Sequence, residues 1–412
     1  MSASRLRYLF LNVGHFADHL FMLIFAKAAF DAGVAFGFGS ERAYAEMIPY
    51  GTPAAILFGA CAPLAAYLAD RWGRNVLMVI FFIGIGLAAI ATGFARSPLE
   101  VAIGLAAVGA FAAIYHPVGI AMLVQGGGNV GFRIGLNGVW GNMGVAAAPL
   151  FAGFILAHYD WRLAFMLPGA ISIAIGVGYW LFMRSGRAVA PTGTAAEKAL
   201  VGFAPDWQRA LIAIFLVTLS GGFVFGAMTF IVPRLFEVHL GGISTDVAVT
   251  GTLAALVYAV AAFAQLLMGM LLDRHAVKPL LFVVVAAQPL LLAAMALLVA
   301  SGGGRADLPL FLVTLFTMAF MFGQIPVSDT VISRYVPDRW RTKVLSIKFA
   351  LNLTIGATVL PIASWILKSG GGFETVLMVL ACAAAFGIAA VLVLPGRPAP
   401  APEAVVAPGN AD

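Results

Sequence analysis

The sequence has few charged residues, few cysteines and no long polar stretch that would form a soluble domain. Charged residues make up 10% of the 412 positions, against about 25% in soluble domains, which excludes a water-soluble globule. The two cysteines, Cys61 and Cys382, lie in apolar segments, so a disulfide framework is not expected. Hydrophobic residues make up 62% of the chain, in repeated runs of roughly 20 residues that are long enough to cross a bilayer as helices. The class indicated is a polytopic α-helical membrane protein.

The usual signatures of an enzyme are also missing. HFADH, His15 to His19, has the histidine spacing of the HExxH zinc motif but lacks the Glu after the first His. No phosphate-binding glycine loop is present, since the Gly-Gly-Gly runs sit at the ends of predicted helices. The net charge of +6 is explained by basic loops on one side of a membrane. We therefore expect no enzyme activity, no cofactor, no resident metal and no nucleic-acid partner.

The apolar runs predict an all-α fold of twelve transmembrane helices in two pseudo-symmetric six-helix bundles. The expected helices are 6–31, 45–69, 75–95, 99–124, 133–157 and 162–183, then 209–235, 247–272, 279–300, 308–333, 343–367 and 373–394. The domains are accordingly an N-terminal bundle (1–183), a cytoplasmic linker (184–208), a C-terminal bundle (209–394) and a disordered tail (395–412).

The two halves resemble one another. LADR at Leu68 is followed 203 residues later by LLDR at Leu271, and the Pro-Val at Pro117 is followed 209 residues later by that at Pro326. Such repeats place a substrate path at their interface. With both termini inside, the outer side keeps only seven of the 24 Lys and Arg residues: Lys27, Arg42, Arg96, Arg162, Arg234, Arg305 and Lys368. This bias predicts cytoplasmic termini in an inner (plasma) membrane.

Two loops carry a family resemblance. YLADRWGRN, from Tyr67 to Asn75, resembles the loop motif between helices 2 and 3 of the major facilitator superfamily, with Tyr67 and Asn75 as departures. GMLLDRHAVK, Gly269 to Lys278, is similar to its degenerate copy, and DWRLAF, from Asp160, is similar to the family's start of helix 6. The resemblance implies a transporter that works by alternating access. It also implies a conformational latch at Asp70, Arg71, Gly73, Arg74, Asp273 and Arg274.

Other segments resemble branches of that superfamily. The fifth helix is similar to the antiporter motif of drug exporters at Gly135, Gly144, Pro149 and Gly153, while two motif glycines are replaced by alanine. A plain small-residue packing seam explains the pattern almost as well. GHFADH in the first helix and AIYHPVG in the fourth resemble the fosmidomycin-resistance exporters. The fourth helix lacks the Arg motif of many proton-coupled exporters, which puts their usual relay in doubt.

Ionisable side chains inside a bilayer are costly and are functional by default. Tyr8, Asn12, His15, Asp18, His19 and Met22 fall within an arc of about 120° on a helix, so we place this face on the central path. In the seventh helix, Gly222 and Gly226 occupy the equivalent places and are expected to leave room. The candidate substrate- and proton-binding residues are His15, Asp18, His19, Tyr115, His116, Asn142, Gln265, Gln324, Asp329 and Asn352. Asp329 and Lys348 can pair near the inner gate, although a snorkelling lysine fits equally well.

The leading hypothesis is a monomeric secondary transporter that moves a small molecule against a proton gradient, by export. Proton-coupled uptake of an organic anion remains open, because protonated histidines, Lys27 and Arg234 attract anions. Transport of a copper-like metal is a third possibility, because His15, His19 and Met22 share one helix face. Simple packing roles for Asp18, or capping by His116 of carbonyls freed by Pro117, are the structural alternatives.

Overall fold

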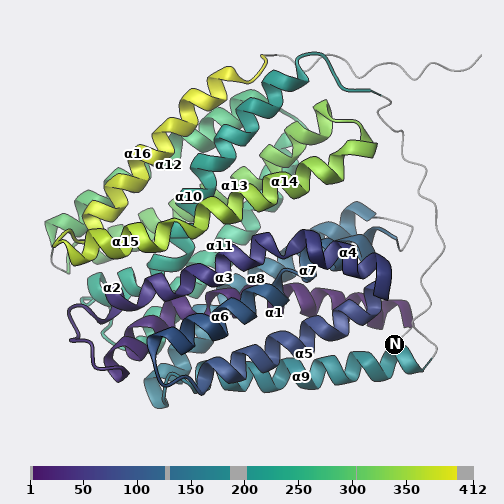
Figure 1. The fold of residues 1–412 in the computed structure, drawn as a ribbon. Coiled ribbons are helices and arrows are strands. Elements are labelled where there is room, and N and C mark those ends of the chain that lie inside the picture. Colours follow the sequence, from purple (N-terminus) through teal and green to yellow (C-terminus); the bar gives the residue numbers. More distant parts are fainter. Residues whose placement is uncertain (1–2, 126–129, 186–201, 303, 397–412) are drawn as a thin grey trace, which may run out of the picture.

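The computed structural model describes residues 3–125, 130–185, 202–302 and 304–396, which are helical throughout apart from short loops (Figure 1). The first half contains α1 (Ala3–Ala35), α2 (Ala43–Met47), η1 (Ile48–Gly51), α3 (Thr52–Ala60), α4 (Ala62–Trp72), α5 (Arg74–Gly93), α6 (Pro98–Ala112), α7 (Tyr115–Val124), α8 (Val130–His158) and α9 (Leu163–Arg184). The second half contains α10 (Trp207–His239), α11 (Val247–Leu272), α12 (Val277–Ser301), α13 (Asp307–Tyr335), α14 (Asp338–Ala357), α15 (Val359–Lys368) and α16 (Phe373–Val393). Most of the predicted linker and tail lies outside the described residues.

The predicted multi-span fold is confirmed. Within the described residues, eleven helical segments are long and apolar enough to span a membrane, and a twelfth span results if the pair Ala43–Ala60 and Ala62–Trp72 counts as one bent span. Two predicted helix ends are wrong. The first helix ends at Ala35 and the seventh at His239, each four residues beyond its predicted end at 31 or 235. Lys27 and Arg234 lie within these helices, and each is paired with Glu237 inside the fold. The first helix contains a second acid, Asp31, nearer its C-terminal end.

Three predicted helices are broken by prolines. The breaks lie at Cys61, at Ala113–Ile114 and at Thr358, each two to four residues before Pro63, Pro117 or Pro361. Proline has no N–H to donate and its ring clashes with the carbonyl four residues earlier. Other prolines, such as Pro149 in α8, lie inside unbroken helices. Proline therefore permits a break, and local packing decides whether one occurs.

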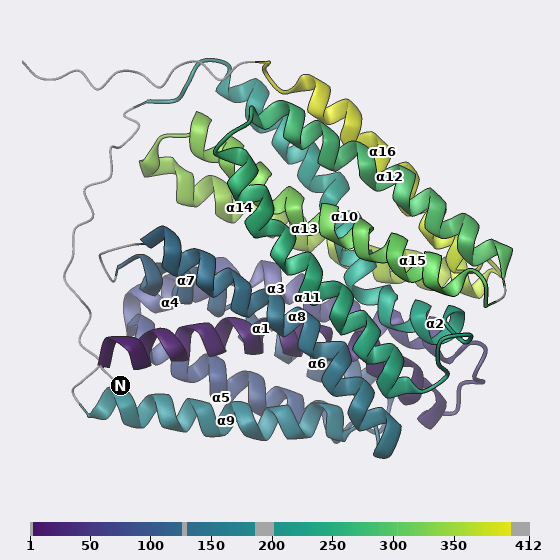
Figure 2. The same cartoon turned by 180° about the vertical axis from the view of Figure 1, so that it is seen from behind.

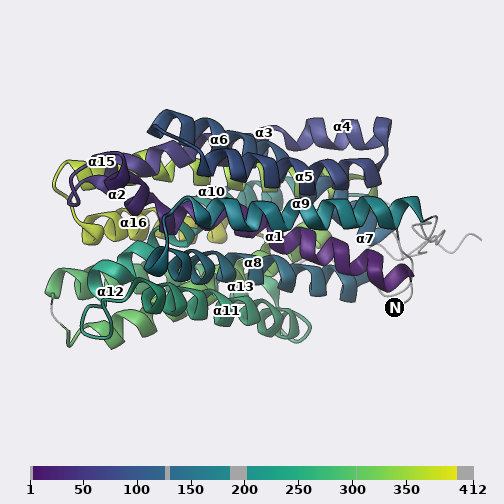
Figure 3. The ribbon, with the colours of Figure 1, turned by 90° about the horizontal axis from the view of Figure 1, so that it is seen from below.

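The helices form two bundles, α1–α9 and α10–α16, that pack side by side and are inclined to one another (Figures 1 and 2). Helix α8 lies between α1 of its own bundle and α11 of the other, an arrangement also visible from below (Figure 3). A Cβ added at Gly144 would lie 2.2 Å from the Phe16 carbonyl, and one at Gly251 would lie 2.4 Å from the Pro149 carbonyl. Small residues therefore bring α8 close to both neighbours. Gly135 has no neighbour within 4 Å, so the predicted packing seam does not extend to it.

Polar contacts join the two bundles at the end away from the N-terminus, where α2 lies beside α15 (Figure 1). Lys368 Nζ donates to Glu46 Oε2 at 3.0 Å, and Ser364 Oγ donates to the Ala45 carbonyl at 2.6 Å. Lys27 of α1 forms an ion pair with Glu237 of α10. The ribbons of α4 and α14 diverge toward the opposite end, which carries the N-terminus. These polar contacts between the bundles thus lie at one end of the molecule.

Candidate functional site

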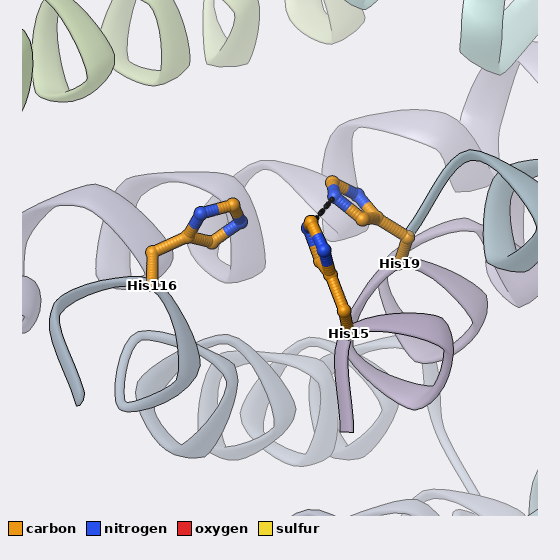
Figure 4. Close-up of side chains that lie close together, drawn as sticks. All are labelled: His15, His19 and His116. Atoms are coloured by element: carbon orange, nitrogen blue, oxygen red, sulfur yellow. Dashed lines mark hydrogen bonds between the residues drawn. The ribbon is translucent and has the colours of Figure 1, made fainter. Parts of the chain in front are cut away.

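Three histidines from two helices, α1 and α7, meet in the N-terminal bundle. Helix α1 places His15 and His19 one turn apart, and the Nε2 atoms of these rings are 3.2 Å from each other. The break before α7 brings His116 to them, with ring centroids 5.1 Å from His15 and 5.6 Å from His19. Figure 4 shows the three rings pointing toward one another. We call His15, His19, His116 and the adjacent Asp18 the histidine cluster.

The His15 ring is held in one orientation. Its Nδ1 lies 2.8 Å from the Asn137 carbonyl oxygen of α8, and because a carbonyl only accepts, Nδ1 carries the proton of this hydrogen bond. The ring stacks on Tyr115 with centroids 4.9 Å apart. Gly141 makes room for it, since a Cβ there would lie 2.6 Å from Nε2. In the neutral ring, Nε2 is therefore the acceptor of the hydrogen bond from His19 Nε2, 3.2 Å away.

Asn137 is a site residue that the sequence analysis missed. It is fully buried, and its amide group bonds to the Tyr115 hydroxyl at 2.8 Å and to Asn12 Oδ1 at 3.0 Å. The Tyr115 hydroxyl also donates to the Leu11 carbonyl at 2.7 Å. This network fixes α1, α7 and α8 behind the histidines. The predicted binding residue of the fifth helix was the other asparagine, Asn142, which is half-buried and lies outside this network.

Asp18 is fully buried, and neither of its carboxylate oxygens has a hydrogen-bond partner. The nearest charge partner is His116, whose Nε2 lies 3.4 Å from Oδ2 but also makes no hydrogen bond. An ionised carboxylate in such surroundings costs several kcal/mol. Asp18 therefore needs a proton, a protonated His116 or another cation to neutralise it. His116 does not cap the carbonyls freed by Pro117 with this nitrogen.

The histidine cluster lies at the surface where the N-terminal bundle meets α14. The His116 side chain is 19% exposed, His19 is partly exposed, and Phe349 of α14 packs on the His116 ring with centroids 4.3 Å apart. His19 and His116 are thus the partly exposed members of the cluster, whereas His15 and Asp18 are buried. The predicted role of the cluster in transport stays a prediction at this point.

The candidates of the second half do not join the cluster. Gln324 bonds to Gln288 at 2.6 Å inside the C-terminal bundle. Lys348 donates to Asp329 at 2.6 Å, so these residues do pair and Lys348 is not a free snorkelling lysine. Asn352 lies beside α10, and Gln265 is half-buried on α11.

The expectation that the seventh helix leaves room opposite the histidines is wrong. A Cβ at Gly222 would lie 2.7 Å from Asn352 Oδ1, and one at Gly226 would lie 2.8 Å from the Gly356 Cα. These glycines let α10 and α14 approach each other closely. The space beside Gly222 and Gly226 is therefore occupied by α14 and is not open.

The latch motif lies at the divergent end of the bundles. Gly73, between α4 and α5, has a φ of +92°, a conformation that favours glycine. Arg71 Nη1 donates to the Tyr67 hydroxyl at 3.4 Å. Asp70, Arg71, Asp273 and Arg274 are exposed, and Arg74 follows the turn as the first residue of α5. No ion pair joins these charges across the bundles in the described parts of the chain, so the latch role stays a prediction.

A second buried polar cluster lies nearer the other end of α1. The Lys27 side chain is completely buried, pairs with Glu237 of α10 and donates to Thr250 Oγ1 of α11 at 3.2 Å. Arg234 Nη1 donates to Glu237 Oε2 at 2.6 Å and stacks over the Phe30 ring at 3.6 Å. We call Lys27, Glu237 and Arg234 the ion-pair cluster. Both cations have an acid partner, so neither is free to attract an anion as the sequence analysis suggested.

Comparison with known proteins supports the same class. The sequence model of the Major Facilitator Superfamily matches residues 20–245 and 239–410. The chain is 31% identical over 150 residues to a puromycin resistance protein of Streptomyces alboniger and 26% identical over 177 residues to a probable sulfoacetate transporter of Cupriavidus necator. These alignments cover 36% and 39% of this chain and 29% and 40% of the relatives, less than half of each.

Solved structures share the fold. A D-xylose–proton symporter superposes with a TM-score of 0.74 at 13% identity, covering 96% of this chain and 97% of that one. An inward-facing, unoccupied bacterial homologue of the lysosomal transporter Spinster superposes with a TM-score of 0.68 at 17% identity, covering 95% of each chain. The family match spans nearly all of the described helices. The chain therefore belongs to the major facilitator superfamily and is a multi-pass membrane transporter.

Proposed function

We propose that this protein is a proton-coupled exporter of small organic molecules, in which the histidine cluster exchanges a proton for the solute. The observation that carries the proposal is Asp18, a carboxyl group without exposure or hydrogen-bond partner in the spanning part of α1. Such groups in transporters mark ion pathways and proton relays.

The histidines give Asp18 a route to the space between the bundles. His116 lies 3.4 Å from the carboxylate and is partly exposed, so a proton on this ring can neutralise Asp18 or leave toward a solute. His19 and His15, in contact through their Nε2 atoms, offer a second path. Imidazole suits this role because it changes charge near neutral pH.

Alternating access requires the two bundles to rock about the site. The ion-pair cluster and the Ser364–Ala45 and Lys368–Glu46 contacts hold the bundles together at one end. With the termini in the cytoplasm, as the distribution of Lys and Arg favours, that end is the outer gate. Release of an exported solute then requires these contacts to break, while the latch loops at Gly73 and Asp273 close the inner side.

The test is a resistance and accumulation screen in cells with and without the gene. The panel includes puromycin, because one relative is named for puromycin resistance. We expect the wild-type protein to lower accumulation of at least one compound, and both Asp18→Asn and a protonophore to abolish this effect. Export that Asp18→Asn supports as well as the wild-type protein does would contradict the proposal.

Uptake of an organic anion is the second candidate. Three imidazoles lie close together and can jointly carry positive charge, and one relative is named as a probable sulfoacetate transporter. Sulfoacetate is the matching probe. Proton-dependent accumulation of sulfoacetate, lost in His116→Asn, would favour uptake over export.

A further inference from the structure

We infer that the histidine cluster is a binding site for a divalent transition-metal ion of the zinc class. The ligand nitrogens of His15, His19 and His116 all lie within 4.8 Å of one another. The inference goes beyond proton-coupled export, although it concerns the same side chains. The metal hypothesis drawn from the sequence rested on His15, His19 and Met22. In the structure the third side chain beside the two histidines is His116.

The separations are close to those that a zinc ion needs. Zinc binds imidazole nitrogen at about 2.0–2.1 Å, which places the nitrogens of a tetrahedral site about 3.3 Å apart. The Nε2 atoms of His15 and His19 already lie 3.2 Å apart. The widest pair must close by about 1.5 Å to meet the same geometry, which rotation of the partly exposed His116 and His19 rings can supply.

The surroundings of the rings are those of a metal site. Metal-binding histidines usually donate their second ring nitrogen to a carbonyl or carboxylate, which fixes the tautomer. His15 does so through Nδ1 to the Asn137 carbonyl, and its Nε2 faces His19. The Tyr115 stack and Gly141 hold the ring in this position. The first ligand is therefore oriented in advance.

Asp18 supplies the negative charge that this cation requires. Its two carboxylate oxygens are fully buried and have no hydrogen-bond partner, and Oδ2 lies 3.4 Å from His116 Nε2. Three imidazoles form a donor set that suits zinc or cobalt with a further coordination position open, and Asp18 lies beside His116 as a neighbouring negative charge. A bound ion would give His116 a partner and would offset the buried charge of Asp18. With the three imidazoles neutral, the Asp18 carboxylate lowers the net charge of the occupied site from +2 to +1.

Metal binding is measured on the purified full-length protein with a tag that contains no histidine. Zinc binding is followed by calorimetry, and cobalt binding by its visible absorption, which is intense for tetrahedral sites. We expect one ion per chain. His19→Ala and His116→Ala should each weaken zinc binding by at least about tenfold, since changes to outer-shell groups alone produce that effect. Asp18→Asn should weaken it as well.

The chain provides a matched control. Half of its six histidines lie in the cluster, and the others, His158, His239 and His275, lie at helix ends. Replacing these three by alanine, in a background that lacks Cys61 and Cys382, should leave zinc binding unchanged. Because His15 is buried and its loss can impair folding, the conclusion rests on the half-buried His19 and His116, whose variants are checked by thermal unfolding.

The inference is overturned if the wild-type protein binds no zinc, or if His19→Ala and His116→Ala bind it as tightly as the wild-type protein does. Binding is measured without a proton gradient, so this result is independent of the transport test. Zinc binding together with unaltered transport by Asp18→Asn would refute the proton role alone. Loss of transport in Asp18→Asn without zinc binding would refute the metal site alone.

Discussion

Helix α1 buries two groups of ionisable side chains that differ in one respect. In the ion-pair cluster, Lys27 has both an acid and a hydroxyl partner, and Glu237 also accepts from Arg234. In the histidine cluster, Asp18 has no hydrogen-bond partner at all. Burial alone therefore does not identify a functional group. The paired group joins the bundles, whereas the unpaired group leaves a place for a proton or a ligand.

The largest loss of stability is expected from Glu237→Gln. This variant removes the ion-pair partner of the buried Lys27, and breaking a buried pair in this way costs about 3–5 kcal/mol. Thermal unfolding in detergent measures the effect. The double variant Lys27→Met with Glu237→Gln should recover much of the loss, and Lys368→Met, which removes a more exposed pair, should cost less than about 1 kcal/mol. Equal losses in all three variants would contradict this account of the ion-pair cluster.

A smaller loss of stability is expected from Gly144→Ala, at the contact of α8 with α1. The side chain of Gly144→Ala would meet the Phe16 carbonyl at 2.2 Å, so α1 and α8 must separate, at a cost of about 1–3 kcal/mol. Gly135→Ala is the matched control on the same helix, because nothing lies within 4 Å of it. Similar unfolding temperatures for the two variants would refute the close packing.

Asn137→Ala tests the support of the histidine cluster without touching its rings. The Tyr115 hydroxyl and Asn12 would lose their amide partner, at about 1–3 kcal/mol. The backbone carbonyl that holds His15 remains, so transport should change little. Asn142→Ala is the control and should change neither property. A complete loss of transport in a stable Asn137→Ala protein would assign this amide to the substrate site.

The smallest loss of stability is expected from Asp18→Asn. No hydrogen bond is removed and a buried charge is eliminated, so the unfolding temperature should stay the same or rise. Transport should nevertheless be lost. A variant as unstable as Glu237→Gln would place Asp18 with the structural ion pairs, and the distinction between the two clusters would fail.

Much of the fold could be predicted from hydropathy and spacing. The span of α11 was predicted at its observed bounds, 247–272. The helix breaks at Cys61 and Thr358, which precede prolines, could not be predicted. Proline also lies inside continuous helices, at Pro149 and Pro168. The last four residues of α1 and of α10 were missed. The pairing of Lys27 with Glu237 was missed as well, because the two residues are distant in sequence and a single sequence does not reveal such a contact.

The site was predicted only in part. Helical phasing brought His15, Asp18 and His19 to one face, and the resemblance of the fourth helix pointed to His116. Asn137 was missed because only the packing of α1, α7 and α8 distinguishes it from Asn142. The sequence did show two asparagines, Asn137 and Asn142, among small residues of one predicted helix, which marks both as candidates for buried polar groups. The glycines of α10 were misread, since a sequence does not say whether a missing side chain leaves space or admits another helix.

The central claim, that Asp18 exchanges a proton, is tested most directly by infrared spectroscopy. The carboxyl C=O stretching band of the wild-type protein is compared at a series of pH values with that of Asp18→Asn. Asp329→Asn, whose carboxylate is exposed and paired with Lys348, is the control. The account predicts a pH-dependent band from a buried carboxyl group that disappears in Asp18→Asn and persists in Asp329→Asn. Identical pH-dependent bands in the wild-type and Asp18→Asn proteins would contradict it.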